Sequence, residues 1–251
     1  MRIVEYGYIF YRNNSLLPII VLPKSKSNMY SAYITMKQTI PVLYINGLGN
    51  GSIQIVDRLI AFWWQMAGAK MYYARVNWYD DEDIETKIQR VESQAQDLLK
   101  AHGGVVILGS SAGGSLALNV FYQLRNQNIC VVCSRARLRV GKYEQSDRNS
   151  LYRRARLGTQ KQSKSFYDSV VRVEDEIIPN LTKSDKQRVF IQSQLVDNIV
   201  PTNLMSIKGV SEQRSFAFDH FDGFLAHMFN GRNRTIYFAK SSLQSHNKID
   251  Y

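Results

Sequence analysis

The chain has 251 residues, of which 45% are hydrophobic, 32 are basic, 21 are acidic and two are cysteine. This composition is typical of a globular protein with a sizeable core, which excludes a chain that is disordered throughout. Two cysteines in a chain of this length also exclude a disulfide-stapled scaffold and a zinc framework. The formal charge of +11 favours anionic partners such as nucleic acid, lipid head groups or a phosphorylated substrate.

The first forty residues contain three short apolar segments separated by turn-forming residues. We expect them to be antiparallel strands, at Ile3–Tyr11, Leu16–Leu22 and Tyr30–Met36. The amino terminus has no long hydrophobic stretch, and no apolar run approaches the ~20 residues that a membrane span needs. We therefore expect a cytoplasmic protein with no transmembrane segment.

From residue 41 onward, short apolar strands alternate with amphipathic helices. The expected strands are Pro41–Ile45, Met71–Val76, Val105–Leu108, Cys130–Cys133, Val189–Gln192 and Ser215–Phe218. The helix after the first of them has one apolar stripe, made of Ile55, Val56, Leu59, Ile60, Trp63 and Met66. This alternation predicts an α/β fold, a mostly parallel sheet flanked by helices on both faces.

Two groups of ligand-type residues in this region have structural explanations. Cys130 and Cys133 have the CxxC spacing, but an offset of three along a strand directs the side chains to opposite faces. We expect two separate buried thiols. The acidic residues 80–83 directly precede a helix, where the macrodipole favours negative charge, so a structural role is favoured over a metal site.

Residues 134–186 interrupt the alternation of strands and helices. They are too many for a simple crossover and too few for an independent domain, so we expect a cap inserted within a single domain that spans residues 1–251. The cap is basic, with ten Lys or Arg residues against two acidic residues between Arg135 and Lys164. Such a segment attracts anions, but it is equally typical of a solvated surface, and no nucleic-acid-binding motif accompanies it.

The segment Gly109–Ser110–Ser111–Ala112–Gly113 has the GxSxG form between an apolar strand and an amphipathic helix. In this context the serine lies at a sharp, strained turn with its side chain exposed, and the glycines avoid collisions with neighbouring elements. The amino terminus of the helix also offers free N–H groups to a developing negative charge. The pattern therefore predicts a nucleophilic serine at Ser111.

A serine nucleophile needs a base, and the base needs an acid to orient it. On this architecture the acid and the histidine follow later strands in that order. Asp197 comes after the fifth expected strand and His220 directly after the sixth. Asp197 is also compatible with plain turn chemistry and His220 with a surface position. His227 competes for the role of base, although its apolar surroundings predict a helix interior.

With these residues the chain resembles the α/β-hydrolases over roughly residues 41–230. The resemblance implies that an acyl-enzyme forms on Ser111, with Asp197 as the acid and His220 as the base. The serine at this position argues against the dehalogenase and epoxide-hydrolase branches, which resemble this fold but use an aspartate nucleophile.

The resemblance also implies an oxyanion hole. Its donors would be the backbone N–H of Ala112 and that of Leu48, in the turn Gly47–Leu48–Gly49 after the first expected strand. Asn46 stands where many α/β-hydrolases have a histidine, so the hydrogen bonds that fix this loop are expected to differ.

The expected activity is hydrolysis of a carboxylic ester, as in serine esterases and lipases, on an acyl ester that carries an anionic group. No motif points to a metal or an organic cofactor. Two alternatives remain open at this point. One is an amidase, thioesterase or acyltransferase on the same scaffold. The other is a non-catalytic protein with this fold, which would bind nucleic acid or an anionic membrane through the cap.

Overall fold

The computed structural model describes residues 39–48, 54–140, 163–195, 197, 200–216 and 225–246. The chain divides into two units, Met1–Met36 and Lys37–Tyr251, and every described residue belongs to the second. The three strands expected in the first forty residues lie outside the described residues and stay a prediction.

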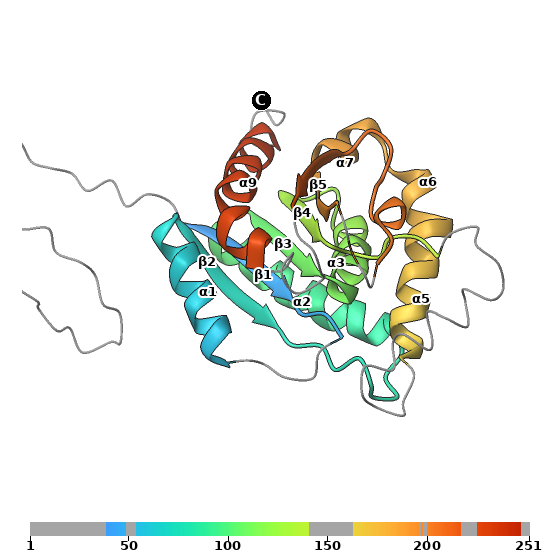
Figure 1. Cartoon of the computed structure of the whole chain (residues 1–251). Helices are drawn as coiled ribbons and strands as arrows, with labels where there is room; N and C mark the ends of the chain where they lie inside the picture. Colours follow the sequence, from blue (N-terminus) through green and yellow to red (C-terminus); the bar gives the residue numbers. More distant parts are fainter. Residues whose placement is uncertain are drawn as a thin grey trace, which may run out of the picture. The chain divides into compact units, whose positions relative to one another are not determined.

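Six strands form one sheet in which every neighbouring pair is parallel (Figure 1). Their order is β2-β1-β3-β4-β5-β6. Strand β2 therefore lies on one side of β1, and β3 to β6 follow in sequence on the other side. The strands are β1 (Ile40–Ile45), β2 (Ala69–Ala74), β3 (Val105–Ser110), β4 (Ile129–Ser134), β5 (Val189–Gln194) and β6 (Ser211–Ser215). Four of them, β1, β3, β4 and β5, are buried along their whole length, as parallel strands covered on both sides must be.

Helices cover both faces of the sheet, which confirms the expected α/β architecture (Figure 1). The helices on one face are α2 (Ile84–His102), α3 (Ala112–Gln123) and α5 (Lys164–Arg172), and those on the other are α1 (Gln54–Met66) and α9 (Arg232–His246). Alternate residues of β4 belong to the two core clusters, with Cys133 in one and Cys130 in the other. The expectation of two separate buried thiols is therefore confirmed.

The last strand and the first helix differ in detail from the sequence expectation. The sixth strand was expected at Ser215–Phe218, but β6 ends at Ser215, and Phe216 beyond it is 87% exposed. On α1, Trp64 rather than Trp63 faces the core: Trp64 is 1% exposed and Trp63 is 44% exposed. The single apolar stripe predicted for this helix was wrong in that respect.

The segment expected to form a cap is described only in part. Residues 141–162 lie outside the described residues, so the cap stays a prediction. After them, α5 continues through a π-helical turn (Val173–Ile177) into α6 (Ile178–Asn180), and α7 (Lys183–Gln187) leads into β5. Phe166, Val170 and Ile177 of this stretch pack in the same core cluster as α3. None of the described helices has both the length and the apolar composition that crossing a bilayer requires.

Candidate active site

Ser111 occupies the turn between β3 and α3. Its backbone has φ 54° and ψ −120°, and only one other non-glycine residue in the described chain, Arg135, has a positive φ. Residues 104–121 are otherwise buried, and Ser111 is the one among them that is partly exposed. The strained turn therefore presents one side chain outward at the carboxyl edge of a fully packed sheet.

The glycines of this turn allow it to pack directly on neighbouring backbone. A Cβ added at Gly109 would lie 2.2 Å from the carbonyl oxygen of Gly113. A Cβ at Gly113 would lie 2.4 Å from the carbonyl oxygen of Ile45, the last residue of β1. Because both distances are far below van der Waals contact, any larger residue would push α3 away from the sheet and move Ser111.

The loop after β1 lies beside Ser111. A Cβ added at Gly47 would be 3.0 Å from the Ser111 Cβ and 3.6 Å from its Oγ. Leu48, the next residue, is partly buried against the core. Ala112 is the first residue of α3, and the first N–H groups of a helix have no acceptor within the helix. Ala112 thus adjoins Ser111 along the chain, and Leu48 follows Gly47, the residue of the loop that lies against Ser111; the role of the two N–H groups stays a prediction.

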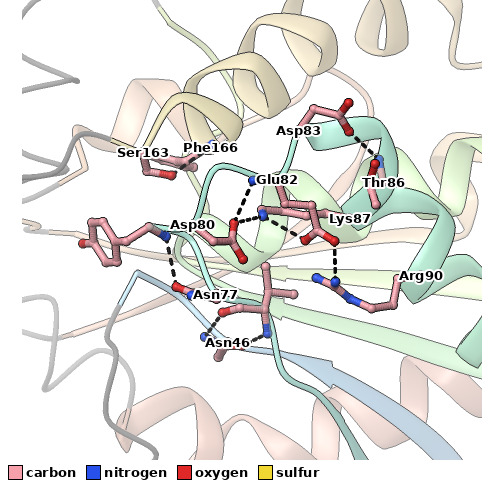
Figure 2. Close-up of polar contacts among 12 residues, drawn as sticks. Asn46, Asn77, Asp80, Glu82, Asp83, Thr86, Lys87, Arg90, Ser163 and Phe166 are labelled. Carbon is pink, nitrogen blue, oxygen red and sulfur yellow. Dashed lines mark hydrogen bonds and ion pairs between the residues drawn. The ribbon is translucent and has the colours of Figure 1, made fainter.

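Asn46 ties this loop to the segment that follows β2. Its side-chain amide donates to the Val76 carbonyl at 3.2 Å, and its Oδ1 accepts from the Val76 N–H at 2.9 Å. Figure 2 shows Asn46 beside this segment, and the Trp78 indole also donates to the Asn46 carbonyl at 3.1 Å. These hydrogen bonds of Asn46 hold the loop after β1 in place, at the position where many α/β-hydrolases have histidine.

Asp197 follows β5 in a half-buried position. Its Oδ1 accepts a 2.8 Å hydrogen bond from the Val200 N–H, which is the turn chemistry that the sequence left open. Because all the strands are parallel, the loops that carry Ser111 and Asp197 leave the same edge of the sheet. His220 lies outside the described residues, and β6, the strand that precedes it, ends at that edge as well.

Arg135 is a residue of this region that sequence reasoning did not single out. It directly follows β4, is only 2% exposed, and donates from its guanidinium to the Oγ of Ser110. Its backbone N–H donates to the Gln192 carbonyl at 2.7 Å. Burial lowers the pKa of the guanidinium to about 10, while the nearby groups of Tyr44 and Asp197 act in the opposite direction. A buried cation therefore lies between the Ser111 turn and the Asp197 loop.

The environment of Arg135 explains why its role was not visible in the sequence. It is one of many basic residues in the stretch expected to be a cap, and nothing in the sequence distinguishes it from them. Arg137 is also buried and donates to the backbone carbonyls of Arg139 and Val140. These two arginines are internal structural cations, so they do not add to a basic surface.

His227 is buried in the helical turn before α9. Its Nε2 lies 3.1 Å from the Ser193 carbonyl and 3.2 Å from the Ser215 Oγ, so it joins the ends of β5 and β6. Its Nδ1 is buried and has no hydrogen-bond partner among the residues that the structure describes. Burial and the charge of Arg135 lower the pKa of His227 to about 4, against the opposing effect of the Ser193 bond. The buried helical setting expected for this histidine is confirmed.

Three of the acidic residues in 80–83 have structural partners: Asp80 and Glu82 pair with cations, and Asp83 caps a helix (Figure 2). Asp83 is the N-cap of α2, where its side chain accepts from the Thr86 N–H at 2.8 Å. Lys87, which is fully buried, pairs with both Asp80 and Glu82. Among the described residues, no group of three or more His, Cys, Asp or Glu side chains is arranged to hold a metal ion.

No protein-family model matches this sequence, and no curated protein is similar to it in sequence. Solved structures do match it. Est1E from Butyrivibrio proteoclasticus with bound ferulic acid has a TM-score of 0.59 at 10% identity, over 82% of this chain and 91% of that one. The monoacylglycerol lipase of Paleococcus ferrophilus has a TM-score of 0.54 at 15% identity, over 83% of this chain and 96% of that one.

An esterase domain of a Rhodothermus marinus protein matches similarly, with a TM-score of 0.54 at 12% identity over 83% of this chain and 89% of that domain. At these identities the likeness concerns the fold. The parallel sheet, the helices on both its faces and the strand–Ser111–helix turn agree with it. The chain therefore has the α/β-hydrolase fold.

Proposed function

We propose that the chain is a serine hydrolase that cleaves a carboxylic ester through an acyl-serine intermediate. The observation that carries the proposal is the backbone of Ser111, which holds a partly exposed serine at φ 54° between a buried strand and a buried helix. Strained backbone of this kind concentrates at active sites, where it positions a reactive side chain. The esterases and lipases among the similar solved structures support the same class of reaction.

In the acylation step His220 removes the proton of the Ser111 hydroxyl as the oxygen attacks the ester carbonyl. The carbonyl oxygen becomes an oxyanion, which accepts hydrogen bonds from the N–H groups of Leu48 and Ala112. Asp197 orients the imidazole and stabilises its protonated form. When the tetrahedral intermediate collapses, His220 returns the proton to the leaving alcohol and the acyl group stays on Ser111.

In the deacylation step a water molecule takes the place of the alcohol. His220 removes its proton, the resulting hydroxide attacks the acyl carbonyl, and the same two N–H groups hold the oxyanion. Collapse of this second intermediate breaks the bond to Ser111, which recovers the proton from His220 and leaves a carboxylic acid. The cycle consumes one ester and one water and needs no cofactor.

The proposed substrate is an ester that carries an anionic group. This preference depends on basic residues in 141–162, since Arg135 and Arg137 are buried and pair internally. The Michaelis constants of matched anionic and neutral esters test it. If anionic esters bind better at low salt and lose that advantage at high salt, the basic cap contributes to recognition, and equal constants would remove its support.

The test of the reaction is labelling with a fluorophosphonate together with steady-state hydrolysis of a p-nitrophenyl ester. We expect the wild-type chain to be labelled and S111A not to be. Ester turnover should fall by about three orders of magnitude or more in S111A and in H220A. H227Q is the matched control for the second histidine and should stay within about tenfold of wild type, because that side chain binds β5 and β6.

Each contrary result has a definite meaning. Labelling that persists in S111A would assign the nucleophile elsewhere, and loss of turnover in H227Q but not in H220A would exchange the two histidines. Parallel assays with an anilide and a thioester separate an esterase from an amidase or a thioesterase. A chain that is neither labelled nor active would leave the non-catalytic alternative.

A further inference from the structure

Helix α1 has a second apolar face that points away from the core. Ile60 and Trp64 are buried against the sheet, at 2% and 1% exposed. Four large apolar side chains one to two turns apart lie on the opposite side, and they are Leu59 (49% exposed), Phe62 (58%), Trp63 (44%) and Met66 (64%). Single exposed apolar residues are common, but an aligned stripe at i, i+3, i+4 and i+7 marks an interaction surface.

This stripe is joined to the neighbouring helical segment of the same layer. The Trp63 ring lies 6.4 Å from the ring of Phe229 in an edge-to-face contact, and the Arg232 guanidinium lies 4.9 Å from the Trp63 ring centroid. Arg232 also donates to the Trp63 carbonyl at 3.0 Å. The α1/α9 face is therefore defined by Leu59, Phe62, Trp63 and Met66 together with Arg232 and the exposed side chains Arg234, Tyr237 and Lys240 of α9.

The two helices that form this face carry more positive than negative charge. Residues 225–246 contain no Asp or Glu and three cations, Arg232, Arg234 and Lys240. Helix α1 contains one residue of each sign, Asp57 and Arg58. The acidic side chains of α2 and α5 belong to the helices on the other face of the sheet. The layer that carries the apolar stripe is thus cationic, while much of the negative charge lies on the opposite layer.

We propose that the α1/α9 face docks the protein on the surface of a bilayer that contains anionic lipid. Aromatic rings of the Trp and Tyr type favour the boundary between head groups and acyl chains, and Leu, Phe and Met side chains fit the acyl region below it. Lys and Arg beside the stripe meet the anionic head groups. This docking concerns a surface other than Ser111 and holds whether or not the proposed ester hydrolysis is correct.

The charge of the face argues against a second copy of the chain as the occupant. A two-fold dimer through this face would place the cations Arg232, Arg234 and Lys240 of both copies against each other, and α1 and residues 225–246 supply a single carboxylate, Asp57, to balance them. A nucleic acid would match the cations, but the aliphatic side chains of Leu59 and Met66 offer it no stacking partner. An anionic lipid surface satisfies both the charge and the apolar stripe.

Flotation of the full chain with vesicles tests the proposal. One set is made of phosphatidylcholine alone and the other of phosphatidylcholine with phosphatidylserine. We expect binding to the second set, weaker binding to the first, and a loss of affinity as salt is raised. R234Q/K240Q and F62S/M66S should each bind the anionic vesicles about tenfold more weakly or worse.

The matched control is K183Q/K208Q, which removes two exposed cations from outside α1 and α9 and should bind as wild type does. The proposal is overturned if the wild-type chain does not float with anionic vesicles, or if the control loses as much affinity as R234Q/K240Q, since net charge alone would then explain binding. It is also overturned if the wild-type chain is a dimer without lipid and F62S/M66S is a monomer. Circular dichroism checks that each variant is folded.

Discussion

Ser111 and Gly47 come from different strand–helix turns, and the contact between them leaves no room for another atom. The position of a Gly47 Cβ is 3.0 Å from the Ser111 Cβ, which is tighter than ordinary van der Waals contact. Either the serine or the loop must then move by a few tenths of an ångström. A displacement of that size is small for folding but large for a nucleophile and an oxyanion donor that act on the same carbonyl.

We therefore expect G47A to fold normally and to lose about tenfold or more in kcat for ester hydrolysis, with a melting temperature close to that of wild type. Steady-state kinetics and a thermal melt on the same preparation measure the two effects. A wild-type kcat in G47A would show that the loop after β1 does not take part in the reaction.

The two cysteines are predicted to be chemically inert in the folded chain. Both are fully buried, and burial raises the pKa of the Cys130 thiol and of the Cys133 thiol to about 12, so almost no thiolate is present at neutral pH. Titration with a thiol reagent should detect neither cysteine under native conditions and both in denaturant. Rapid reaction of either thiol in the native chain would contradict the packing of β4.

At the scale of elements, the start of α2 shows how acidic residues with similar sequence neighbours have different roles. Asp83 caps the helix through the Thr86 N–H, and this bond and a further one to the Thr86 side chain lower the pKa of the Asp83 carboxyl. Asp81 lies two residues earlier and is exposed. The two positions thus offer a matched pair of charge deletions.

D83A should reduce the free energy of unfolding by about 1 kcal/mol, the usual cost of losing a helix N-cap. D81A removes the same charge without removing the cap and should change the free energy of unfolding by less than about 0.5 kcal/mol. Urea denaturation of the two variants side by side measures the difference. Equal losses would mean that charge, and not the cap, accounts for the effect.

The elements that the sequence predicted well are those whose burial is uniform. β3 and α3 lie in the core on every side, so their apolar residues mark them directly, and Ser111 between them was located from its motif. β6 could not be found in this way because it is a polar, partly exposed strand of the sequence Ser-Glu-Gln-Arg-Ser, and the apolar residues after it drew the prediction too far along the chain.

The same reasoning explains the error on α1 and the omission of Arg135. A helix with apolar residues on two faces has no single stripe, so periodicity alone cannot decide whether Trp63 or Trp64 is buried. A buried arginine depends on partners distant in sequence, here Ser110 and the carbonyl of Gln192. The residues around Arg135 in the sequence give no sign of such distant partners. Ser111 and Asp197 could be located because each follows a strand that the sequence shows.

At the scale of the whole molecule, His227 makes stability depend on pH. The pKa of His227 is lowered to about 4 by burial and by Arg135, while in the unfolded chain it has its ordinary value of about 6.5. Between these two values the unfolded state binds more protons than the folded state does. The contribution of His227 to stability is therefore complete above pH ~6.5 and is lost as the pH falls towards ~4.

We expect this residue to account for roughly 2–3 kcal/mol of the stability lost between pH ~7 and pH ~4. H227Q keeps a neutral donor for the Ser193 carbonyl, so its free energy of unfolding should change less over this range even if it is lower at pH 7. Urea denaturation at several pH values measures both slopes. Identical slopes for wild type and H227Q would contradict the assignment.

The polar character of β6 also bears on how separate copies of the chain meet. β6 is the outermost strand on its side of the described sheet, and such a strand offers unpaired backbone groups to any other extended chain. Here Glu212 and Arg214 form an ion pair along it, and Glu212 is held by Ser193 of β5. Charged side chains on an edge strand disfavour pairing with another chain, so β6 is protected against strand-to-strand association between copies of the protein.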